Sequence, residues 1–170
     1  LARAYTGRQG MIVQENGYHG HTTGTIDISP YKFTGPGGSG CADWVEVVPA
    51  PDCYRGEYGY EDINAGSKYS AAVVQAIERL SLKGNPMAGF IAETYPSVAG
   101  QIIPPKDYLP QVYEKIHSSG GVCIADEVQT GLGRCGKYYW GLEDSKVVPD
   151  IVVIGKPCGN GYPIGVVVTT

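Results

Sequence analysis

Short apolar runs recur along this chain, and most are followed at once by polar or glycine-rich sequence. Runs that are apolar at successive positions are typical of strands buried on both faces of a sheet, rather than of strands with one face in water. We expect six such strands, at residues 10–14, 45–48, 87–92, 121–125, 150–154 and 164–168.

Two other segments show helical periodicity. In 70–83 the apolar side chains fall on one helical face, and Gly84 follows as a stop signal. In 107–119 apolar residues recur at helical spacing, Asp107 can cap the start, and Gly120 ends the pattern. Both segments therefore predict amphipathic helices that cover a sheet.

The order of these elements predicts the fold class. Strand 87–92, helix 107–119 and strand 121–125 form a βαβ unit, which is parallel and right-handed in nearly all proteins. Residues 27–66 are rich in Gly, Pro, Ser and Tyr, and we expect a long surface excursion around one short strand. The sequence thus predicts an α/β fold with three αβα layers and a mostly parallel sheet.

Composition narrows the class of protein. Apolar residues make up 42% and charged residues 18% of the chain, which is ordinary for a globular domain, and no apolar run approaches the ~18 residues of a membrane span. The net charge of −4 gives no electrostatic reason to expect a nucleic-acid or membrane partner. The five cysteines show no close pairing, so we expect free thiols in a cytoplasmic protein. The first residue is not Met and the last run is apolar, so we expect a fragment of a larger protein.

Polar side chains follow four of the predicted strands. In a parallel sheet the carboxyl ends of the strands meet at one edge, where ligands bind, so these side chains should converge. In chain order they are Tyr18 and His19, Glu93, Asp126 and Gln129, and Lys156.

Lys156 is the sharpest candidate, because it is the only charged residue between Asp150 and the end of the chain. We expect burial to desolvate it partly and so to favour the neutral, nucleophilic amine that forms Schiff bases. Pro157 and nearby glycines would fix its turn. The alternative is an ordinary lysine at a strand end, with its stem lying on apolar surface.

A nucleotide-binding ATPase domain is a further alternative. Asp126 could bind a metal, and 131–137 fits the phosphate-loop pattern G-x-x-x-x-G-K, although Tyr138 stands where that loop needs Ser or Thr. Residues 35–40 fit G-x-G-x-x-G, but they follow no predicted strand and open no predicted helix. We expect a plain glycine-rich loop at 35–40, and the phosphate-loop match at 131–137 is weak.

His19 and His21 could form a metal pair, since both side chains are common metal ligands. No third ligand is evident near them. We expect solvated loop histidines and no metal site.

Taken together, these segments resemble the class III aminotransferases, which are fold type I enzymes that depend on pyridoxal 5'-phosphate (PLP). The resemblance rests on residues 16–20, 125–134 and 149–161. Residues 31–38 and 100–105 carry a narrower similarity to alanine–glyoxylate aminotransferase 2-like proteins, a subfamily that includes phospho-lyases acting on ethanolamine phosphate.

The resemblance implies roles for the strand-end residues. Lys156 would form a Schiff base with PLP and move the Cα proton, and Asp126 would pair with the pyridine nitrogen. Tyr18 and Val128 would pack on the two ring faces, and Gln129 would approach the 3-oxygen. The residues that this resemblance places at the cofactor are Tyr18, His19, Glu93, Asp126, Val128, Gln129 and Lys156.

The implied reaction is transfer of an amino group from a primary amine or amino acid to a keto or aldehyde acceptor. A phospho-lyase that eliminates phosphate from an O-phosphorylated amine uses the same residues, and an inactive dimerisation module is a third possibility. The resemblance also implies a homodimer. Thr94 replaces the proline that usually follows the family's glutamate, and the family's phosphate-binding loop and small domain are not found here. We therefore expect 1–170 to be a partial large domain that does not hold PLP tightly alone.

Overall fold

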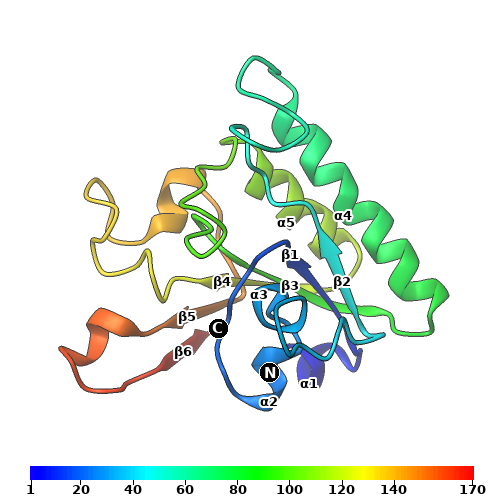
Figure 1. Ribbon diagram of the computed structural model, residues 1–170, viewed down its shortest axis with the longest axis horizontal. Coiled ribbons are helices and arrows are strands. Elements are labelled where there is room, and N and C mark those ends of the chain that lie inside the picture. The colour runs from blue at the N-terminus through cyan, green and yellow to red at the C-terminus, as the bar shows by residue number, and fades with distance from the viewer.

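A six-stranded sheet forms the centre of the computed structural model, which describes residues 1–170 (Figure 1). Its strands lie in the order β2-β1-β3-β4-β5-β6, and every neighbouring pair is parallel except β5 with β6, which is antiparallel. The prediction of a mostly parallel sheet is confirmed, and each predicted strand overlaps an observed one. The strands are β1 (Gly10–Gln14), β2 (Val45–Val48), β3 (Met87–Glu93), β4 (Val122–Asp126), β5 (Ile151–Ile154) and β6 (Val166–Thr169).

Two long helices pack side by side on one face of the sheet (Figure 1). They are α4 (Ala65–Leu82) and α5 (Tyr108–Ser118), which correspond to the two predicted amphipathic helices. The opposite face contacts the short α1 at the start of the chain. No helix is both long and apolar enough to cross a membrane. The short helices are α1 (Ala2–Thr6), α2 (Thr23–Ile26) and α3 (Pro30–Phe33), with the 3₁₀ turns η1 (Gly141–Ser145) and η2 (Lys156–Gly159).

The core forms on both faces of the sheet because successive strand residues point to opposite sides. In β1, Ile12 packs under α4 and α5, whereas Met11 and Val13 join the cluster on the other face. Val73 and Leu80 of α4 are completely buried. Each large apolar side chain buried in this way contributes about 1.5–3 kcal/mol to stability, so the sheet and the two long helices form one stable platform.

Helix α4 begins earlier than the periodicity predicts, at Ala65 rather than at residue 70. Its first turn contains Gly66, which is unfavourable in a helix interior and hides the pattern. The structure explains this residue, because a Cβ at position 66 would lie 2.1 Å from Oδ1 of Asp107. The glycine lets the start of α5 pack closely against the start of α4. The predicted excursion at 27–66 accordingly ends where α4 begins and also contains α3.

The parallel strands bring their carboxyl ends to the same edge of the sheet. Glu93 at the end of β3 lies opposite Asp126 at the end of β4 in the strand register. Glu127, the residue after β4, is tied to β5 because its backbone N–H donates to the Val153 carbonyl. The expected convergence of strand ends is therefore present.

Candidate active site

A cavity of about 370 Å³ lies at this edge of the sheet, and all seven residues that sequence reasoning singled out line it. The remaining lining comes from Gly20, from the turn after β3, from the end of β5 with Gly155, and from the two residues before β6. The seven predicted lining residues are Tyr18, His19, Glu93, Asp126, Val128, Gln129 and Lys156.

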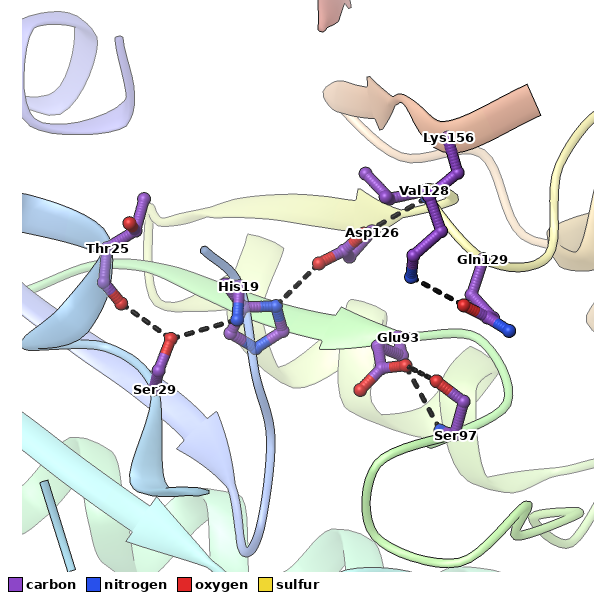
Figure 2. A network of polar contacts seen from close by, with 9 residues as sticks. All are labelled: His19, Thr25, Ser29, Glu93, Ser97, Asp126, Val128, Gln129 and Lys156. Carbon is purple, nitrogen blue, oxygen red and sulfur yellow. Dashed lines mark hydrogen bonds and ion pairs between the residues drawn. The ribbon is translucent and has the colours of Figure 1, made fainter. Parts of the chain in front are cut away.

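Asp126 is held in place by two donors from different segments. Its Oδ2 lies 2.7 Å from Nδ1 of His19, and its Oδ1 accepts the backbone N–H of Val128 at 3.1 Å (Figure 2). Both side chains of the pair are nearly inaccessible, at 1% for His19 and 7% for Asp126. A carboxylate in such a site needs partners, and these contacts fix its orientation toward the cavity.

This contact corrects one prediction. We expected His19 to be a solvated loop residue, but its side chain is buried against Asp126. Its position is set by Ser29, whose Oγ accepts the His19 backbone N–H at 2.8 Å and donates to the carbonyl of Thr25 at 2.6 Å (Figure 2). The parallel strands bring His19 and Asp126 to the same sheet edge, but no local sequence signal shows that the His19 side chain is buried there.

Lys156 lies just beyond β5, at the first position of η2. Its Nζ donates to Oε1 of Gln129 at 2.5 Å, so the amine reaches across the cavity to the segment after β4 (Figure 2). Its backbone has φ of +43°, a left-handed conformation that costs free energy in a residue with a Cβ. Strained backbone of this kind clusters at functional sites.

The expected burial of Lys156 is wrong, because the residue is exposed. The apolar neighbours that suggested burial belong to β5, and the lysine lies past the end of that strand. The predicted fixed turn is present. Pro157 follows within η2, and Gly161 adopts a φ of +96°.

Glu93 has one satisfied and one open carboxylate oxygen. Its Oε2 accepts both the backbone N–H of Ser97, at 3.1 Å, and the Ser97 hydroxyl. Its Oε1 is buried and has no hydrogen-bond partner. Because Glu93 lines the cavity, this oxygen is available to a ligand that enters it.

Glu127 is a residue that sequence reasoning missed. Its carboxylate is almost fully buried, and it accepts hydrogen bonds from the hydroxyls of Thr94 and Thr130 and the backbone N–H groups of Gly141 and Leu142, at 2.6–2.9 Å. Thr94 is therefore part of this network. The sequence does contain a signal for this role. Asp126 and Glu127 are consecutive acids at a strand end, and consecutive side chains of a strand point to opposite sides. Asp126 faces the cavity, and Glu127 fixes the loop behind it.

The alternative phosphate-loop interpretations fail on structural context. Residues 131–137 form turns, and no helix begins at Lys137. Residues 35–40 follow α3 and likewise open no helix. A phosphate-binding loop of either type needs a strand before it and a helix N-terminus after it.

One group of possible metal ligands lies at the opposite edge of the sheet, at His117, Cys123 and Asp150. Two of these residues already pair with each other, since Asp150 Oδ2 lies 2.8 Å from His117 Nε2, and the same oxygen accepts the Cys123 backbone N–H at 2.7 Å. Burial, reinforced by the nearby Asp150 carboxylate, raises the pKa of the Cys123 thiol well above its ordinary value. These contacts favour a structural role in joining α5 to the sheet.

Proteins of known family resemble this chain in both sequence and fold. The model of the class III aminotransferase family matches residues 1–170. The chain is 47% identical to "Alanine--glyoxylate aminotransferase 2-like" of Drosophila melanogaster, over 100% of this chain and 35% of that protein. It is 42% identical to "Ethanolamine-phosphate phospho-lyase homolog 1" of Caenorhabditis elegans, over 99% of this chain and 38% of that protein.

Solved structures agree. A phospholyase from Arthrobacter in complex with phosphoethanolamine superposes with a TM-score of 0.89 at 33% identity, covering 99% of this chain and 39% of the other. A taurine:2-oxoglutarate aminotransferase from Bifidobacterium kashiwanohense, in complex with PLP and glutamate, gives 0.80 at 29% identity, with 99% and 38% coverage. The chain thus spans between a third and two fifths of its relatives' length. With its large-domain fold and matching family model, the chain belongs to the class III aminotransferases, a family that uses PLP.

Proposed function

We propose that the protein containing these residues is a PLP-dependent transaminase, which moves an amino group from a primary amine or amino acid to a keto or aldehyde acceptor. The observation that carries the proposal is the grouping of Lys156, Gln129 and the His19–Asp126 pair around one cavity. We further propose, from the family resemblance, that it acts as a homodimer.

The chemistry of the lining fits PLP. Asp126 offers an oriented carboxylate for a protonated ring nitrogen, and Lys156 offers an amine for the cofactor's aldehyde. Tyr18 and Val128 supply an aromatic and an apolar surface in the same cavity. The open oxygen of Glu93 and the Gln129 amide supply further polar contacts.

Different residues of this chain would bind the cofactor, move the proton and orient the reacting amine. Bound PLP supplies an electron-accepting ring that stabilises negative charge at the substrate Cα. Lys156 would hold the cofactor and move the Cα proton at its Nζ, as a general acid and base. Asp126, kept in place by His19 and the Val128 N–H, would keep the ring nitrogen protonated. Gln129, which now accepts a hydrogen bond from Lys156, would orient that amine.

Chemical labelling tests the proposal. Borohydride treatment of the PLP-loaded intact protein should leave a pyridoxyl group on Lys156, which peptide mass spectrometry would locate. Lys137 and Lys146 are the natural internal controls, because neither lines the cavity. A label on either of these, or no label at all, would contradict the proposed role of Lys156.

A phospho-lyase is the second candidate, and a specific observation favours it. A relative named as a phospho-lyase homolog and a solved phospholyase are both among the proteins reported above, at 42% and 33% identity. Elimination of phosphate also starts with removal of a Cα proton, so Lys156 and Asp126 serve either reaction equally. A substrate panel separates them. Release of inorganic phosphate without keto-acid formation would overturn the transaminase proposal and support the lyase.

A further inference from the structure

The phenol of Tyr18 is held from outside the cavity by a second histidine of the same turn. Its hydroxyl lies 2.5 Å from Nδ1 of His21, and the two rings meet edge to face with centroids 5.6 Å apart. Tyr31 makes another edge contact with Tyr18, at 6.1 Å between centroids. His21 itself is exposed and does not line the cavity. Its contact with the site therefore runs through Tyr18.

The backbone at Gly20, between the two histidines, lets their side chains point to different partners. Gly20 has φ of +125°, a conformation that side chains rarely adopt, and a Cβ there would lie 3.0 Å from the Thr25 hydroxyl oxygen. With this glycine in place, His19 reaches Asp126 while His21 reaches Tyr18. The next residue, Thr22, is fixed because its backbone N–H donates to Thr25 Oγ1 at 2.9 Å. His21 thus lies between two constrained positions.

We propose that His21 is a positioning residue that holds the Tyr18 ring at the orientation in which it forms one wall of the cofactor site. The inference rests on the proposed function, since the wall is useful only if a planar cofactor packs against it. A half-buried tyrosine can rotate about two side-chain torsions, and a hydrogen bond at the far end of the ring removes most of that freedom. Fixing a binding group beforehand strengthens binding, because less conformational entropy is lost on association.

A double-mutant cycle tests this in the intact protein. The variants are His21→Ala, Tyr18→Phe and the two combined, and the readouts are the dissociation constant for PLP and the absorption spectrum of the bound cofactor. Loss of one such hydrogen bond should weaken PLP binding about three- to tenfold in His21→Ala. In the Tyr18→Phe background the same change should add no further loss, because the hydroxyl is already gone.

Two more variants sharpen the result. His21→Asn keeps a polar atom near the place of Nδ1 and should recover most of the affinity. His117→Ala is the matched control, because His117 also lies edge-on to a tyrosine, with centroids 6.2 Å apart, but at the opposite edge of the sheet. That variant should bind PLP as the unmodified protein does.

The outcomes separate the two ideas. If the unmodified protein binds PLP and His21→Ala binds it equally well, the role of His21 is wrong and the proposed function stands. If His21→Ala weakens binding equally with and without the Tyr18 hydroxyl, His21 does not act through that group. If the unmodified protein binds no PLP, the proposed function fails and this inference fails with it.

Discussion

Lys156→Ala should lower the turnover of the intact protein by about 10²- to 10⁴-fold, the range expected when a positioned proton-transfer group is removed. Lys156 is the only lysine that lines the cavity, and its partner Gln129 cannot carry a proton in its place. Steady-state kinetics with a saturating amine and acceptor would measure the loss.

The control for this experiment must match the backbone as well as the charge. Lys146→Ala does so, because Lys146 also has a left-handed backbone, with φ of +53°, and lies outside the cavity. Any cost of placing alanine in that conformation should be similar in the two variants. Turnover should stay near normal in Lys146→Ala. Near-normal turnover in Lys156→Ala would mean that another group moves the proton.

Glu127→Gln should destabilise the protein by about 3 kcal/mol, because a buried acceptor of several hydrogen bonds becomes partly a donor. One of the two carboxylate oxygens is replaced by an NH₂ group, which faces donors rather than acceptors. Hydroxyl groups can rotate to accommodate this, but the backbone N–H groups of Gly141 and Leu142 cannot. Urea unfolding would show the loss as a lower midpoint with an unchanged slope.

Two variants check that the loss comes from the buried network. Glu143→Gln changes an exposed carboxylate of the same loop, which accepts a single backbone N–H, from Trp140 at 2.8 Å, and it should shift stability by less than about 1 kcal/mol. Thr94→Val removes one of the donors to Glu127 and should cost about 1–2 kcal/mol. A Glu127→Gln protein as stable as Glu143→Gln would refute the structural role.

The sheet and the site edge could be predicted because their signals are local. Strands β3 and β4 are continuous apolar runs, and the acid that ends each of them, Glu93 or Asp126, marks the edge directly. Once the strands are parallel, the rule that their carboxyl ends meet brings those residues together without further information. This is why the predicted strand-end residues line one cavity, whereas Val128 is predicted only from the family resemblance.

What the sequence could not show depends on contacts between distant segments. Nothing near His19 or His21 says that one is buried against Asp126 while the other is exposed. The early start of α4 is hidden by Gly66. A glycine is needed there because a Cβ would clash with the side chain of Asp107. Lys156 is exposed although apolar residues precede it, because β5 ends at Ile154, two residues before the lysine.

The antiparallel β6 has a consequence for the reach of the lysine. Because Ile154 of β5 pairs with Val166 of β6, residues 155–165 form a loop whose two ends are held together by the sheet. A short closed loop has few conformations, so its amine stays within a small volume and its effective concentration at Gln129 is high. The edge strand β6 contributes no polar group to the cavity. By pairing with β5, it nevertheless limits how far the lysine can move.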